Sequence, residues 1–135
     1  MSNPAFALMT AMRLALLARP ALLALLQGQH VYEEKPRGAE KTIVAFDGIE
    51  TRDWSVKDQR AHEHFVTLAV ETNARSRKLA QDIVAEIEAA LDNQPLTLAG
   101  HALVNLRLAF WAVSRARNAE TFNATLRFRA ATEPL

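Results

Sequence analysis

The apolar residues of this chain change their spacing near Gly28, and this change constrains the fold more than any other feature. Before Gly28, leucine and alanine recur at the spacing of one helix face. After it, several segments alternate apolar and polar residues, as strands with one buried face do. In a chain of 135 residues, both periods together predict helices packed on a sheet within a single domain, residues 1–135.

Two helices are predicted before the change of period. Asn3 suits a helix cap and Pro4 suits a first helical turn, which predicts a helix over residues 4–18. Pro20 then begins a shorter helical segment, and Gly28 is expected to terminate it.

This N-terminal run is apolar enough to resemble a membrane helix or a signal peptide, but its charges argue against both. Arg13 and Arg19 interrupt the run and Pro20 breaks it, so no part reaches the ~20 apolar residues that a bilayer crossing requires. A signal peptide carries its positive charge before the apolar region, whereas here the charges lie inside it. We therefore expect no membrane partner.

The rest of the chain predicts strands and one longer helix. Residues 76–93 predict this helix, whose apolar stripe consists of Leu79, Ile83, Ile87 and Leu91. The clearest strand is 62–72, where Val66, Leu68 and Val70 share one face. The predicted strands are 30–32, 42–50, 62–72, 96–98, 101–113 and 121–130. Neighbouring strands of this kind predict an α+β fold, with a mainly antiparallel sheet and helices packed on one face.

Histidines offer the first candidate metal site. His62 and His64 fall on one side of a predicted strand, about 7 Å apart by strand rise, and so could supply two ligands. No third ligand follows at a recognisable spacing, and His30 and His101 would need the fold to bring them near. We interpret these histidines as residues at a strand start that face solvent.

Acidic residues offer a second candidate. Asp47, Glu50 and Asp53 could form a carboxylate cluster for magnesium or for acid/base chemistry. In a hairpin, alternating acids more often form a solvated edge, which is how we interpret them. No phosphate-binding loop, nucleophile elbow or dinucleotide fingerprint is present in the sequence. The sequence therefore predicts no catalytic centre, no metal site and no cofactor.

The net charge and the cysteine content exclude further classes of partner and site. With 16 basic and 15 acidic residues the net charge is +1, so no global field favours nucleic acid or an anionic membrane. Any charge-driven contact must be local. The absence of cysteine excludes disulfides, thiolate metal sites and a cysteine nucleophile.

The arginines of the last two strands are more informative than the histidines. If strands 101–113 and 121–130 form a hairpin about the loop 114–120, one face is expected to point inward. Its members are Val104, Leu106, Leu108 and Phe110 together with Phe122, Ala124, Leu126 and Phe128.

The opposite face of this hairpin then carries a ladder of like charges. Arg107 is expected opposite or diagonal to Arg127 or Arg129, where like charges repel by up to ~1 kcal/mol. Either solvent and acids of the same chain compensate this ladder, or it contacts another subunit or DNA. Trp111, expected on the same outward face, and Trp54, in the polar loop 51–61, are further candidate anchors.

The order and spacing of several segments resemble those of a known family. These segments are the helical "ALLALLQGQHVY", the "PRGA" turn, the helix of 76–93 with basic residues at its start, the hairpin "LTLAGHALVNL" and the closing "TLRFRAATEP". Over nearly the whole chain they resemble the tail completion, or tail terminator, proteins of siphophages, gene transfer agents and prophages.

This resemblance implies a structural virion protein. Such a protein would form a hexameric ring at the head-proximal end of a long non-contractile tail, where it stops tube polymerisation and joins the tail to the head connector. Its partners would be its own copies, the tail-tube protein and a head connector or head-completion protein, with non-specific contact to DNA in the channel. It would assemble in the bacterial cytoplasm and remain in the tail.

Candidate contact residues follow from this reading. Arg37, Trp54 and Trp111 are predicted at subunit or tail interfaces, and Arg107, Arg127 and Arg129 on a basic face toward the channel or a neighbouring subunit. Two other classes stay open. A metal-dependent nuclease would use His62, His64 and nearby acids, and a ligand-binding module of a bacterial chromosome would be a monomer with a saturable pocket.

Overall fold

The computed structural model describes residues 3–36, 41–117 and 120–135, which form three helices and a six-stranded sheet. The sheet order is β1-β2-β3-β6-β5-β4, and every neighbouring pair is antiparallel except β1 with β2. The predicted α+β class with a mainly antiparallel sheet is therefore confirmed. In chain order the elements are α1 (Pro4–Leu17), α2 (Pro20–Leu26), β1 (Val31–Tyr32), β2 (Ile43–Asp53), β3 (His62–Glu71), α3 (Arg77–Leu91), β4 (Thr97–Leu98), β5 (His101–Arg115) and β6 (Phe122–Pro134).

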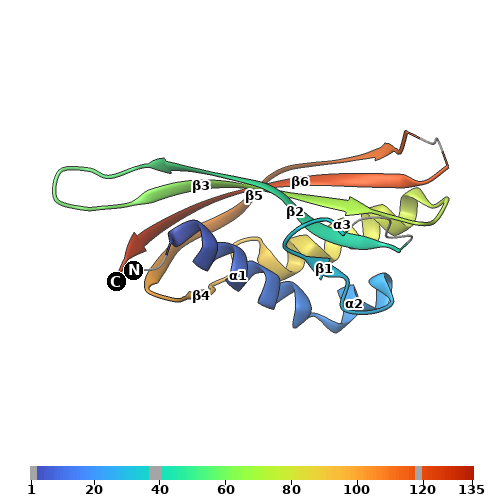
Figure 1. The fold of residues 1–135 in the computed structure, drawn as a ribbon, viewed down its shortest axis with the longest axis horizontal. Helices are drawn as coiled ribbons and strands as arrows, with labels where there is room; N and C mark the ends of the chain where they lie inside the picture. Colours follow the sequence, from blue (N-terminus) through green and yellow to red (C-terminus); the bar gives the residue numbers. More distant parts are fainter. Residues whose placement is uncertain (1–2, 37–40, 118–119) are drawn as a thin grey trace.

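The helices lie together on one face of the sheet (Figure 1). The hairpin of β2 and β3 projects beyond the helices at one end of the molecule, and the end of β5 and the start of β6 lie at the opposite end (Figure 1). Long strands thus extend past the helical layer, and parts of the sheet have no helix over them.

Residues at the termini of α1 and α2 explain where these helices begin and end. The Asn3 side chain accepts hydrogen bonds from the amides of Ala5 and Phe6, at 2.8 and 3.2 Å, as expected of a cap. The helix α2 ends in a left-handed residue, which is Gln27 (φ 58°), one position before Gly28. Among the described residues, no single helix has the length and apolar character to cross a membrane; only α1 and α2 together do, and they are bent by 82°.

The helix α3 supplies the largest share of the helix–sheet contact. Ser76 caps it by accepting a hydrogen bond from the Leu79 amide at 3.1 Å. Ile83, Ile87 and Leu91 are fully buried, as their spacing predicts, whereas Leu79 is only half-buried at the margin of the core. The apolar stripe of this helix therefore packs on the sheet.

Strands β3 and β6 form the centre of the sheet and follow the predicted alternation. Val66, Leu68 and Val70 of β3 are fully buried toward the helices. The predicted inward residues of β6, namely Phe122, Ala124, Leu126 and Phe128, are also buried. Because neither strand contains an irregularity where the two pair, their sequence period maps directly onto two faces.

The prediction for β5 is wrong at two of its four inward positions. Leu106 is buried and Leu108 half-buried, but Val104 is 50 % exposed and Phe110 is 51 % exposed. The register of β5 on β6 shifts once between Leu103 and Asn105 and again between Leu108 and Phe110. Each shift inserts one extra residue, which moves the following side chains to the other face.

The hairpin of β2 and β3 is longer than predicted. Residues 51–53 continue β2, although the sequence predicts them as part of a loop. The tip is closed by paired hydrogen bonds between Val56 and Gln59, at 2.9 and 2.6 Å, with Lys57 at a positive φ of 32°. The polar segment after Thr51 is therefore an ordered strand end and tight turn.

Candidate interaction surface

The face of the sheet that points away from the helices carries arginine and aromatic side chains. Phe65 of β3 lies opposite Arg129 of β6 in the register, and Arg127 is the next residue on that face. The guanidinium carbons of Arg127 and Arg52 lie 5.0 and 5.4 Å from the centre of the Phe65 ring. Both distances are within the range of cation–π attraction. We refer to Arg52, Phe65, Arg127 and Arg129 as the arginine face.

Arg129 connects this face to the tip of the first hairpin. Its Nε and Nη2 both lie 2.6 Å from Oε2 of Glu63, and its guanidinium carbon lies 5.2 Å from the centre of the Trp54 ring. Trp54 follows the last residue of β2 and is 46 % exposed. The arginine therefore fixes the position of a tryptophan that still presents half of its surface to solvent.

The predicted arginine ladder exists in the register, because Arg107 lies opposite Arg129. Each of these two arginines forms an ion pair with an acid of the same chain. Arg129 pairs with Glu63, and Nε of Arg107 lies 3.5 Å from Oδ1 of Asp92, the C-cap residue of α3. Among the described residues Arg127 makes no ion pair, so no acid neutralises its charge, and its guanidinium contacts the Phe65 ring instead.

Trp111 does not share a face with Arg107, contrary to the prediction. It lies opposite Leu126, whose side chain points toward the helices, yet Trp111 is 45 % exposed. The shift in register before Phe110 is the cause, and it places Phe110 opposite Arg127 on the arginine face instead. Sequence reasoning missed Phe110 as a surface residue, because an extra residue in a continuous apolar run leaves no mark in the period.

An apolar hollow adjoins Trp54. Its volume is about 280 Å³, and Trp54, Val56, Gln59, Ala61, Val104 and Glu133 line it. Val104 reaches the surface here because it is the extra residue of the first irregularity in β5. Exposed apolar side chains from two hairpins thus meet at one place, which is a common property of protein contact surfaces.

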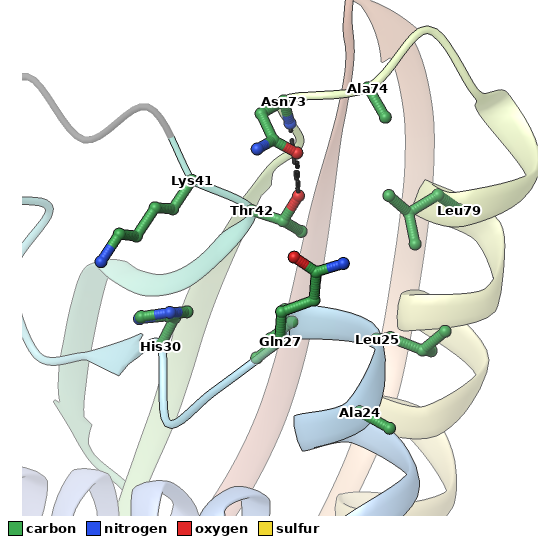
Figure 2. Close-up of a pocket in the computed structure, with 10 residues that line it drawn as sticks. Ala24, Leu25, Gln27, His30, Lys41, Thr42, Asn73, Ala74 and Leu79 are labelled. Carbon is green, nitrogen blue, oxygen red and sulfur yellow. Dashed lines mark hydrogen bonds between the residues drawn. The ribbon is translucent and has the colours of Figure 1, made fainter.

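A second pocket lies on the other side of the molecule, next to the end of α2. Its volume is about 440 Å³, and His30 and Lys41 lie on one side of it, with Ala24, Leu25 and Leu79 on the other (Figure 2). At its edge the Thr42 hydroxyl donates to Oδ1 of Asn73 at 2.8 Å (Figure 2). The described residues of its lining include no acid, so they lack the paired groups that acid/base chemistry uses.

His64 is buried, contrary to the prediction that the strand-start histidines face solvent. Its Nδ1 lies 2.9 Å from the hydroxyl oxygen of Thr51 and its Nε2 lies 2.9 Å from that of Thr132. Burial, followed by the nearby charges of His62 and His101, lowers the pKa of His64 to about 4. A neutral ring can donate to one threonine and accept from the other, so His64 serves as a buried polar link.

The other candidate ligands are not brought together. Among the described residues, no group of three or more histidines and acids lies close enough to hold a metal ion. Asp47, Glu50 and Asp53 lie along the exposed length of β2, and hydrogen bonds from Ser55 lower the pKa of Asp53. Arg37 lies outside the described residues.

Comparison with known proteins assigns the chain to a family. The family model described as "Tail completion protein gp17" matches residues 10–133. The chain belongs to this family. Tail completion proteins are structural tail proteins, and the chain is one of them.

A solved structure supports the same assignment. A chain from "Virion of native gene transfer agent (GTA) particle" superimposes with a TM-score of 0.87 at 29% sequence identity. The match covers 98% of this chain and 99% of that chain. A comparison with curated proteins gave no match.

Proposed function

We propose that this tail completion protein forms a hexameric ring at the head-proximal end of a long non-contractile tail. There it terminates polymerisation of the tube and joins the tail to the head connector. The observation that carries the proposal is the near-complete superposition on a chain of a gene transfer agent virion. Its partners are further copies of itself, the tail-tube protein and the connector, and it acts in the tail after assembly in the bacterial cytoplasm.

The surface chemistry supports a structural role. The exposed features of the described residues include the arginine face, the hollow beside Trp54 and the exposed rings of Phe110 and Trp111. Aromatic and arginine side chains dominate protein contacts, because they bury large areas and form several interactions at once. Such a surface suits a subunit that meets neighbours on more than one side.

Among these arginines, Arg127 is the one that we propose contacts a partner. Arg107 and Arg129 each have an acid of the same chain within reach, whereas Arg127 has an aromatic ring. In the ring its guanidinium faces either the DNA channel or an acid of the adjacent copy. Both roles use the positive charge in a way that folding of the single chain does not require.

Deletion of the gene tests this proposal. Cells that produce particles without the chain should yield overlong tubes, or heads and tails that stay separate, in negative-stain micrographs. Supplying the intact gene from a plasmid should restore joined tails of normal length. Tails of normal length joined to heads in the deletion strain would contradict the proposed function.

A further inference from the structure

Two strands of the sheet have long edges without a strand beside them in the described part of the chain. On the outer side of β5, β4 pairs only with His101 and Ala102. On the outer side of β2, β1 pairs only with Val44 and Ala45. Residues 109–114 of β5 and 47–53 of β2 therefore lie at opposite edges of the same sheet, each open to a further strand.

Main-chain hydrogen bonds indicate which groups of β5 point outward. The Leu106 carbonyl accepts from the Asn93 amide at 2.7 Å, and the Leu108 amide donates to Oδ1 of Asp92 at 2.8 Å. Leu106 and Leu108 thus direct these groups away from β6. In an antiparallel pair the direction alternates with every residue of the partner strand.

The same alternation extends along β6 to the open part of β5. Leu106 lies opposite Ala130, and Leu108 lies opposite Phe128. Every second residue of β6 continues this series: Leu126 lies opposite Trp111, and Ala124 lies opposite Val113. The main-chain amides and carbonyls of Trp111 and Val113 therefore also point away from β6. Beyond the Asp92–Asn93 turn, no strand of the described residues pairs with these groups, so another strand can do so.

The composition of this edge is unusual for one that faces only water. Residues 109–114 read AFWAVS, with no charge and no proline, and Ala109, Phe110, Trp111 and Ala112 are exposed. Soluble proteins normally protect such edges with charged residues, proline or short strands, because unprotected edges pair with other chains. Past the irregularity at Ala109, this apolar edge continues in register with β6 and is suited to a partner strand.

The open edge of β2 differs from it in charge. Residues 47–53, DGIETRD, contain the acids Asp47, Glu50 and Asp53 and one base, Arg52. The whole of β5 contains no acid and two arginines, Arg107 and Arg115. The acidic edge of β2 would thus meet an uncharged, apolar edge with an arginine just before it and another just after it. Repulsion between like charges disfavours pairing of the β2 edge with itself.

Strand direction agrees with pairing of β5 with β2. Since β2 is antiparallel to β3, β3 to β6 and β6 to β5, strands β2 and β5 run in opposite directions within one copy. When all copies of a ring point the same way, β5 of one copy therefore meets β2 of the next as an antiparallel neighbour. The open parts lie toward opposite ends of the sheet (Figure 1), so the copies meet with a stagger, which tilted strands in a closed sheet accommodate.

We propose that the open edge of β5 pairs with the open edge of β2 from a second copy, so that one sheet continues from subunit to subunit. The contact joins two different surfaces, and such a contact generates a closed ring when the rotation between copies closes. This inference rests on the proposed function, since it names the elements that join the copies of the ring.

Engineered cysteines test the pairing, because the natural chain has none. Ala112→Cys lies opposite Thr125 in β5, and Arg52→Cys lies opposite Glu63 in β2, so both cysteines are exposed on the arginine face. Removing Arg52 keeps all three acids of β2. A short bismaleimide is added to purified tails and to the isolated chain, and the products are separated under denaturing conditions.

The double variant should give a ladder of covalent multimers, whereas each single variant should stay a monomer. A control that combines Ala112→Cys with Glu88→Cys, on the outward side of α3, should give no ladder. Covalent dimers from Ala112→Cys alone would indicate pairing of β5 with itself and would overturn the inference.

The two proposals fail in different ways. Tails that contain the double variant but yield no ladder would overturn the edge pairing and leave the ring at the head-proximal end standing. Purified tails that lack the chain would contradict the proposed function. In that case, cross-linking of the isolated double variant tests the edge pairing. A ladder would support the pairing, and its absence would overturn it.

Discussion

Nε2 of His64 lies 2.9 Å from the hydroxyl oxygen of Thr132, and this contact joins β3 to β6 inside the protein. On its other side the ring contacts Thr51 of β2, so one imidazole links three neighbouring strands at the base of the projecting hairpin. Protonation of this ring places a charge in a buried site beside two further histidines.

Stability should therefore fall on acidification below pH 6.5. The folded pKa of His64 is about 4, below its ordinary value of 6.5, so the unfolded chain binds the proton first. The contribution of neutral His64 is complete above pH 6.5 and is lost as the pH falls toward 4. Urea unfolding should lose about 2–3 kcal/mol between pH 7 and 4.5 through this residue.

The variant His64→Gln separates this effect from the titration of other groups. His64→Gln should remove most of the difference between pH 7 and 4.5, whatever its cost at pH 7. An equal pH dependence in the natural chain and in His64→Gln would contradict the role of this residue.

Core packing predicts a sharp contrast between the two sides of α3. Ile83→Ala removes a fully buried side chain and should cost ~2–5 kcal/mol in the free energy of unfolding. Glu88→Ala, on the exposed side of the same helix, should change it by less than about 0.5 kcal/mol. Chemical denaturation measures both, and similar losses would mean that this helix packs differently.

The two ion pairs of the arginine ladder should differ in strength. Arg129 meets Glu63 at 2.6 Å through two nitrogens at a half-buried site, whereas Arg107 meets Asp92 at 3.5 Å at an exposed one. A double-mutant cycle should give a coupling of about 1–3 kcal/mol for the first pair and under about 0.5 kcal/mol for the second. Equal couplings would contradict the geometry.

Charge reversal at Arg127 should impair assembly without unfolding the chain. Arg127→Glu alters an exposed side chain, so the midpoint of thermal unfolding should stay close to that of the natural chain. Micrographs should nevertheless contain overlong tubes or unjoined heads and tails. Lys78→Glu, on the exposed side of α3, is the control and should leave tails normal. Normal tails in both variants would show that Arg127 is solvated and has no role in assembly.

The free edge of β5 offers a matched pair of alanines. Ala112→Glu adds an acid where we expect the acidic edge of β2, so it should prevent ring formation. Ala85→Glu adds the same charge on the exposed side of α3 and should leave assembly intact. Light scattering compares the oligomeric state of each variant with that of the natural chain, and unchanged assembly of Ala112→Glu would argue against a contact at this edge.

The regular elements could be predicted because nothing interrupts their period. In α3 and in the paired parts of β3 and β6, each apolar side chain at the expected spacing meets the core, and the pairing of Arg107 with Arg129 follows from strand register. The faces of Val104, Phe110 and Trp111 could not be predicted. An extra residue in the apolar run of β5 changes the face without changing the composition.

The burial of His64 was equally inaccessible to sequence reasoning. Its two partners, Thr51 and Thr132, belong to other strands, and Thr132 is 68 residues away in the chain. A short polar residue that bonds a distant histidine has no local signature. Knowledge of the sheet order was needed to see that these three residues meet.

A cryo-EM reconstruction of the head–tail junction from purified particles tests the central claim most directly. The account predicts a closed hexameric ring of this chain between the last ring of tube subunits and the head connector. A junction in which the tube meets the connector without this chain, or in which the chain occupies the distal end of the tail, would contradict it.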